Sequence, residues 1–115
     1  KKIFTGDTLF SLGCGRIFEG TYEQMFNSLN KIKELPKDTE IYCGHEYTLQ
    51  NASFCLANDQ TNLRLKEKIT KIKKQLENNL PSIPTTLADE IECNIFLKAK
   101  DLKSFSKLRD LKDNF

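Results

Sequence analysis

The sequence predicts a mixed α/β part followed by an all-helical part, and two patterns carry this prediction. Over residues 1–46, a strand, a loop, a helix and a second strand follow one another, which is the order found in part of an α/β layer. After residue 47, the apolar residues recur at helical spacing instead. We therefore expect two portions, an α/β portion over residues 1–46 and a helical portion over residues 47–115.

Two short strands frame the first part. Residues 2–5 and 40–43 are rich in β-branched and aromatic side chains, and Gly6 and Gly44 follow them directly. Between the strands, residues 9–12 are largely apolar and lead into a glycine-rich turn. A strand that opens the chain would expose an unpaired edge, so we expect its partner strands to belong to sequence beyond these 115 residues.

The first helix has a clear start and stop. The Thr21 hydroxyl can cap its first turn while Gln24 reaches back, which is the capping-box pattern. Pro36 ends it, because the residue before a proline avoids helical geometry. One face is apolar at spacings of three and four, through Tyr22, Met25, Phe26, Leu29 and Ile32.

After residue 47 the sequence predicts four more helices. They cover residues 49–56, a longer stretch that starts at Thr61 or Asn62, residues 84–90 and residues 104–111. Residues 94–97 leave helix and strand open. The lysines of the longer helix form a basic stripe, which we interpret as a solvated helix face.

Composition excludes several classes of function. A net charge of +2 is too small to argue for nucleic acid as a partner. No apolar run approaches the ~20 residues that a membrane span needs. The four cysteines lack a C-x-x-C pair, which disfavours a zinc ribbon, and no stretch resembles a signal peptide. We expect reduced thiols and a cytoplasmic location, with an organelle as the alternative.

Asp7 and His45 are the candidate metal ligands, and each follows a predicted strand. The Asp7 carboxylate has two oxygens that can bridge two metal ions, and the His45 ring can bind one of them. Loops at strand ends commonly carry function. Taken singly, both residues also fit structural roles, because Gly-Asp-Thr is a common turn and His45 is the one histidine of the chain.

Three motifs in order resemble the glyoxalase II family, the hydroxyacylglutathione hydrolases of the metallo-β-lactamase fold. They are TGDTLF at residues 5–10, GCGR followed by FEGT at residues 13–21, and YCGHEYT at residues 42–48. The likeness continues through Pro84, residues 86–88 and the final KDNF. It covers essentially the whole chain, and it implies the C-terminal part of an αββα sandwich followed by a helical substrate-binding domain.

The resemblance implies hydrolysis of the thioester S-D-lactoylglutathione to D-lactate and glutathione. The reaction would take place at two divalent metal ions, usually zinc, with iron or manganese as alternatives. Asp7 matches the family's bridging carboxylate and His45 its last histidine ligand, so both are the expected catalytic residues.

The resemblance also implies a set of glutathione contacts. Arg16 and Tyr47 match two of them, and Arg109 and Lys112 match the cations at the glycine carboxylate end. Phe18 departs from the pattern, because many members have tyrosine at this place. We therefore expect a hydroxyl contact to be missing there, with an effect on affinity more than on chemistry.

The family's remaining metal ligands come from an H-x-H-x-D-H stretch and a further histidine upstream of Asp7. With one histidine, this chain cannot supply them, and a catalytic zinc takes three protein ligands. We therefore expect a C-terminal fragment that is inactive alone, as a monomer or a swapped dimer.

Two alternatives remain open. One is another enzyme on the same fold, such as a persulfide dioxygenase. The other is a helical module that binds an acidic partner through its basic face. The long helical region after Tyr47, together with Arg109 and Lys112, favours the glutathione thioesterase.

Overall fold

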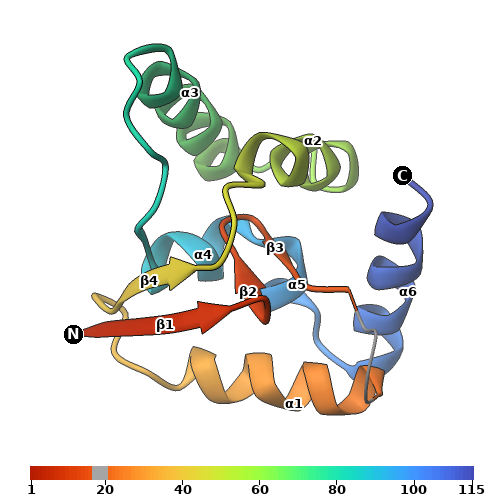
Figure 1. The fold of residues 1–115 in the computed structure, drawn as a ribbon. Coiled ribbons are helices and arrows are strands. Elements are labelled where there is room, and N and C mark those ends of the chain that lie inside the picture. The colour runs from red at the N-terminus through yellow and green to blue at the C-terminus, as the bar shows by residue number, and fades with distance from the viewer. Residues whose placement is uncertain (17–20) are drawn as a thin grey trace.

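A computed structural model describes residues 1–16 and 21–115, and it shows a mixed α/β protein with two small sheets (Figure 1). In the larger sheet, the central strand β4 (Glu40–Cys43) pairs in parallel with β1 (Lys2–Gly6) and antiparallel with β5 (Thr85–Thr86). The smaller sheet is the antiparallel hairpin of β2 (Leu9–Phe10) and β3 (Gly13–Cys14). The predicted mixture of strands and helices is confirmed.

Most of the chain after β4 is helical. The helices of the described residues are α1 (Tyr22–Lys33), α2 (Thr48–Asn58), α3 (Leu63–Glu77), α4 (Leu87–Cys93), α5 (Ile95–Lys98) and α6 (Leu102–Asp113). The capping box of α1 is present, because the Thr21 side chain accepts from the Gln24 N–H and the Gln24 side chain accepts from the Thr21 N–H. The side chains of Asn62, Thr86 and Asp101 each accept from the N–H three residues later and so cap α3, α4 and α6.

The expected helix over residues 84–90 begins later than predicted. Thr85 and Thr86 pair with Ile41 and Glu40, so they form β5 before Thr86 caps α4. The region after residue 47 is therefore not entirely helical, which corrects the expectation of an all-α second part. The open segment 94–97 is mostly helical, because Asn94 accepts from the Phe96 N–H and starts α5.

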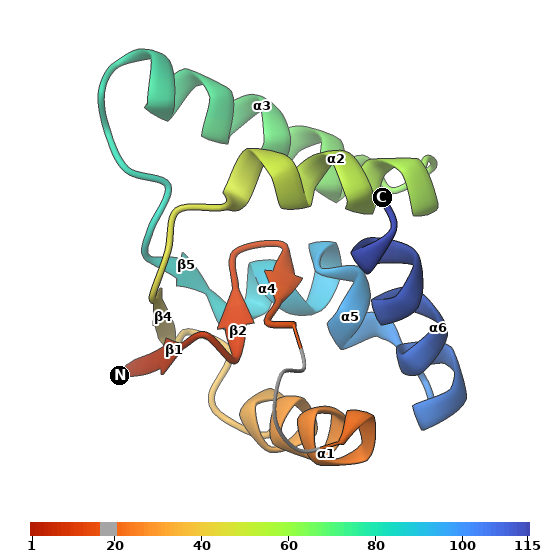
Figure 2. The ribbon, with the colours of Figure 1, turned by 45° about the vertical axis from the view of Figure 1, so that its right-hand side comes forward.

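The β2–β3 hairpin lies at the centre of the molecule, with α2 on one side and α1 on the other in both views (Figures 1 and 2). Its residues Leu9 and Leu12 are fully buried. They share one hydrophobic core with Leu29 of α1 and Ile41 of β4, and with residues from every helix of the described chain. The hairpin is thus enclosed by segments far apart in the sequence.

One edge of β1 carries no strand partner among residues 1–16 and 21–115. Phe4 lies on this strand with 79% of its surface exposed, and its ring packs against Tyr42 with the centroids 5.3 Å apart.

In the described part of the chain, no helix is long and apolar enough to cross a membrane.

Gly15 stands where the chain leaves the hairpin and passes close to the end of β1. Its N–H donates to the Thr8 carbonyl at 3.1 Å. A Cβ atom at this position would lie 1.9 Å from the carbonyl oxygen of Asp7, a backbone atom that cannot move aside cheaply. Only glycine therefore allows the hairpin to approach the turn at residue 7 this closely.

We expect Gly15→Ala to lower the free energy of unfolding by about 3 kcal/mol, because the added methyl group overlaps backbone. Gly6→Ala is the matched control. It adds a methyl group in open space, at a φ of +52°, and should cost about 1–2 kcal/mol for the left-handed conformation alone. Urea denaturation followed by circular dichroism measures both. A Gly15→Ala chain as stable as Gly6→Ala would contradict the close approach.

Candidate active site

The parallel pairing of β1 and β4 brings Asp7 and His45 together. Gly6 and Cys43 are opposite each other in the register, and the Gly44 N–H donates to the Gly6 carbonyl at 2.7 Å. Residues that follow two adjacent parallel strands emerge at the same sheet edge. The His45 Nε2 atom accordingly lies 3.3 Å from Asp7 Oδ1, and the two side chains are 52% and 73% exposed.

Aromatic packing orients the His45 ring. Tyr47 stacks on it with centroids 5.0 Å apart and an interplanar angle of 16°. Phe10 of the hairpin meets Tyr47 edge-on at 5.2 Å and lies 6.2 Å from His45. Such contacts restrict the rotation of a ring that is otherwise half exposed.

Glu46, between His45 and Tyr47, links this segment to Ser82 in the stretch before β5. Its carboxylate accepts from the Ser82 N–H at 2.8 Å, the Ser82 hydroxyl at 2.5 Å and the Thr48 hydroxyl at 2.6 Å. Burial alone would raise the pKa of Glu46, but these hydrogen bonds outweigh it and lower the pKa. The carboxylate therefore stays charged and keeps the loop in place.

A surface cavity of about 450 Å³ gathers the predicted site residues. Those that line it are Asp7, Arg16, His45, Tyr47, Arg109 and Lys112. The remaining predicted residue, Phe18, lies outside the residues that the structure describes. The cavity joins the ends of β1 and β4 to the last helix.

The three cations of the cavity differ in their surroundings. Arg109 is 2% exposed, and its guanidinium donates to the carbonyls of Cys14 and Gly15 at 2.7 and 3.2 Å and to Asp113 at 2.8 and 3.0 Å. Arg16 is 59% exposed and lies 3.5 Å from the same Asp113. Burial, followed by the positive charges of Arg109 and Arg16, lowers the pKa of Lys112. Arg109 thus ties α6 to the hairpin, while Arg16 is open to solvent.

Sequence reasoning did not single out five other residues of the lining, namely Phe10, Cys14, Gly15, Gln50 and Asn51. Three of them stand in or beside motifs already noted, since Phe10 ends TGDTLF and the other two belong to GCGR. Gln50 and Asn51 lie in the first turn of α2, and no local pattern marks them.

Cys14 is 6% exposed, and burial raises the pKa of its thiol to about 11 despite the nearby Arg109.

Asp7 and His45 fit a metal ion as two of its ligands. Two donors on a tetrahedral zinc, with bonds of roughly 2.0–2.1 Å, stand about 3.3 Å apart, which is also the Asp7–His45 separation. Within residues 1–16 and 21–115, no group of three or more His, Cys, Asp or Glu side chains is placed to hold a metal. Among the described residues, the pair could therefore supply two donors to a metal ion but not a complete ligand set.

Comparison with known proteins places the chain in a family. The model named "Hydroxyacylglutathione hydrolase C-terminus" matches residues 46–115. A hydroxyacylglutathione hydrolase of Pelagibacter ubique (strain HTCC1062) is 66% identical over 115 residues, which are 100% of this chain and 48% of that protein. One from Prochlorococcus marinus (strain MIT 9301) is 52% identical over 111 residues, covering 96% of this chain and 45% of the relative.

The likeness extends to more distant bacteria. A hydroxyacylglutathione hydrolase of Vibrio campbellii (strain ATCC BAA-1116) is 46% identical over 113 residues, with 98% of this chain and 45% of the relative covered. The chain spans about half the length of the curated relatives it matches. Because the family model covers more than half of the chain and the relatives share its full extent, the chain belongs to the hydroxyacylglutathione hydrolase family.

Proposed function

We propose that the cavity between Asp7, His45 and α6 is the glutathione-binding part of an active site that hydrolyses S-D-lactoylglutathione to D-lactate and glutathione. One observation carries the proposal: two metal-ligating side chains and three cations line the same cavity. A thioester of glutathione presents a reactive carbonyl on its central cysteine sulfur and a carboxylate at each end of the tripeptide, so it needs both kinds of group.

The cations are proposed to bind the two carboxylates of glutathione. Arg16 is the more exposed of the two arginines in the cavity. Lys112 lies one helical turn from Arg109 on α6. A charge-assisted hydrogen bond contributes about 1.5–3 kcal/mol. Lys112 would take the glycine carboxylate end, and Arg109 would support it with its charge, because that guanidinium already donates to Asp113 and to the Cys14 and Gly15 carbonyls. Arg16 would take another carboxylate, and the Tyr47 hydroxyl a further polar group. Phe18 would lack such a hydroxyl.

The metal site is proposed to hold two divalent ions, with zinc as the first choice and iron or manganese as alternatives. Asp7 and His45 would be two of the ligands. When bound, such ions polarise a carbonyl and supply a nucleophile at neutral pH. The other ligands must come from outside the described residues of this chain, since these hold no group of three or more donors.

The chain's own residues would orient the His45 imidazole. The stacking of Tyr47 on His45 and the hydrogen bonds of Glu46 hold the imidazole toward Asp7. The leaving group is a thiolate, whose conjugate acid has a pKa of about 8.5. It departs without a strong general acid, so a cavity with few proton donors is chemically adequate.

The finer architecture and location are also proposals. We propose that residues 1–46 form the C-terminal portion of a metallo-β-lactamase αββα sandwich, and residues 47–115 a helical glutathione-binding domain. The parallel β1–β4 pair with α1 between its strands in sequence supports the first part. Four free cysteines are in keeping with a cytoplasmic location.

The first test is binding of glutathione to the chain, measured by isothermal titration calorimetry. We expect Arg16→Ala and Lys112→Ala each to raise the Kd roughly tenfold, the equivalent of about 1.4 kcal/mol. Lys73→Ala, on the solvated face of α3, is the control and should leave the Kd unchanged. Equal Kd values for Arg16→Ala and the unaltered chain would remove Arg16 from the glutathione site.

The second test is hydrolysis in a fusion that adds the unmatched part of the Pelagibacter ubique relative to this chain. We expect turnover of S-D-lactoylglutathione, and a drop in kcat of roughly 100-fold or more for Asp7→Ala. Metal analysis by mass spectrometry should show fewer than two ions per molecule in that variant. Asp38→Ala, before the opposite end of β4, is the matched control. Full activity of Asp7→Ala would contradict the assignment.

A further inference from the structure

The turn of the β2–β3 hairpin is held by side chains from the helices. Asn51 and Cys55 of α2 donate to the carbonyls of residues 11 and 12 at 3.2 and 3.1 Å. Asn94, between α4 and α5, donates to the carbonyl of Gly13 at 3.0 Å. The hairpin strands are two residues long, so these contacts, more than its own ladder, determine its shape.

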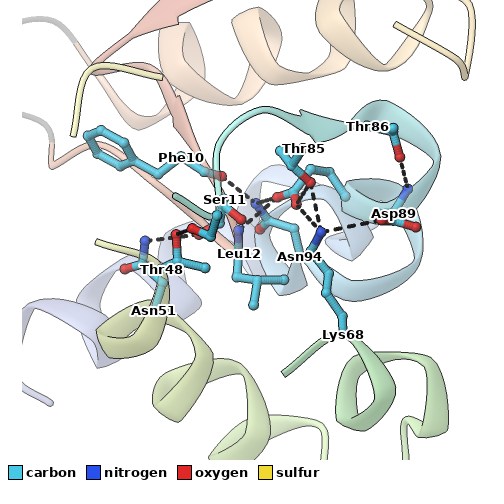
Figure 3. A network of polar contacts seen from close by, with 12 residues as sticks. Phe10, Ser11, Leu12, Thr48, Asn51, Lys68, Thr85, Thr86, Asp89 and Asn94 are labelled. Carbon is cyan, nitrogen blue, oxygen red and sulfur yellow. Dashed lines mark hydrogen bonds and ion pairs between the residues drawn. The ribbon is translucent and has the colours of Figure 1, made fainter. Parts of the chain in front are cut away.

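Glu90 of α4 joins several of these contacts. Figure 3 shows the residues that surround it, among them Leu12, Thr85, Asn94 and Lys68. Glu90 is fully buried, and its Oε1 accepts from the Leu12 N–H at 2.8 Å and from Asn94 Nδ2 at 3.0 Å. Its Oε2 accepts from the Thr85 hydroxyl at 2.9 Å and lies 3.9 Å from Lys68 Nζ. A buried carboxylate needs this many partners to be tolerated.

Leu12 makes the turn depend on Glu90. Its φ is +62°, a left-handed conformation that a leucine rarely adopts unless its surroundings hold it there. Its side chain is fully buried in the core, and the partner of its N–H is the Glu90 carboxylate. Without that acceptor, a buried N–H would lose its hydrogen bond, and a different turn would satisfy it better.

The β2–β3 turn determines where two residues of the cavity lie, Phe10 and Arg16. Phe10, on the strand before it, packs against Tyr47 and lies near His45. Gly15 and Arg16 follow the strand after it, and Arg16 lines the cavity. A change of the turn therefore moves both an aromatic wall and a cation of the site.

We propose that Glu90 is a positioning residue for the glutathione site, which sets the β2–β3 turn and through it the places of Phe10 and Arg16. The inference rests on the proposed function, because it assumes that this cavity receives glutathione. Glu90 itself does not line the cavity; it acts through the hairpin backbone.

Three variants of the chain test the proposal. Glu90→Leu removes the acceptor. Glu90→Gln is the conservative variant, because its amide oxygen can still accept from the Leu12 N–H. Asp89→Asn is the matched control, since this neighbouring carboxylate contacts Arg64 and Lys68 of α3, whereas Glu90 accepts from the Leu12 N–H.

The readouts are amide hydrogen exchange by nuclear magnetic resonance and the Kd for glutathione. In Glu90→Leu, exchange of the Leu12 N–H should rise at least tenfold relative to that of Ile69 in α3, and the Kd should rise at least fivefold. Glu90→Gln and Asp89→Asn should stay within twofold of the unaltered chain in both. Loss of stability alone would speed exchange at Leu12 and Ile69 together.

If Glu90→Leu does not fold, Glu90→Asp takes its place, because aspartate keeps the carboxylate on a side chain that is shorter by one methylene. If the exchange rate of the Leu12 N–H in the folded variant changes by the same factor as that of Ile69, the role of Glu90 in the turn is overturned. Altered exchange with an unchanged Kd would overturn its role in the site. An unaltered chain that binds no glutathione would overturn the proposed function itself, whatever the exchange shows.

Discussion

The parallel pairing of β1 with β4 is the constraint on which the site depends. It makes Gly6 and Cys43 neighbours, so Asp7 and His45 emerge side by side although 38 positions separate them in the sequence. A Cβ on Gly44 would lie 2.8 Å from the Asp7 carboxylate and 3.2 Å from the Gly6 carbonyl oxygen, so a side chain there would displace Asp7. The backbone pairing thus sets where the two potential ligands emerge.

The helices contribute to the site mainly by shaping backbone. Arg109 of α6 and Glu90 of α4 are both buried, and both hydrogen-bond to main-chain atoms of the hairpin segment between residues 12 and 15. A helical portion that held substrate alone would not need buried charges directed at the neighbouring sheet. The α/β portion and the helical portion therefore share one core and build one cavity together.

Local signals were readable from the residues themselves, and most long-range contacts were not; the expectation that Asp7 and His45 share a site rested on the family resemblance. The Thr21–Gln24 capping box involves neighbouring residues and the general order of strands and helices follows from periodicity, so both were predicted. The bond from the Leu12 N–H to Glu90 spans 78 positions and has no local pattern. The short strand β5 forms because β4 offers it an edge, which the sequence of Thr85 and Thr86 alone does not reveal. The burial of Arg109 depends likewise on the distant Cys14 and Gly15 carbonyls.

The burial of Cys14 has a consequence for the redox chemistry of such a cavity. Thiol–disulfide exchange requires a thiolate, and a thiol with a pKa of about 11 is ionised in roughly one molecule in ten thousand at pH 7. The thiol of Cys14, which lines the cavity, is therefore nearly inert toward the oxidised form of the proposed ligand. A protein that repeatedly receives a sulfur-bearing tripeptide would in this way avoid becoming covalently attached to it.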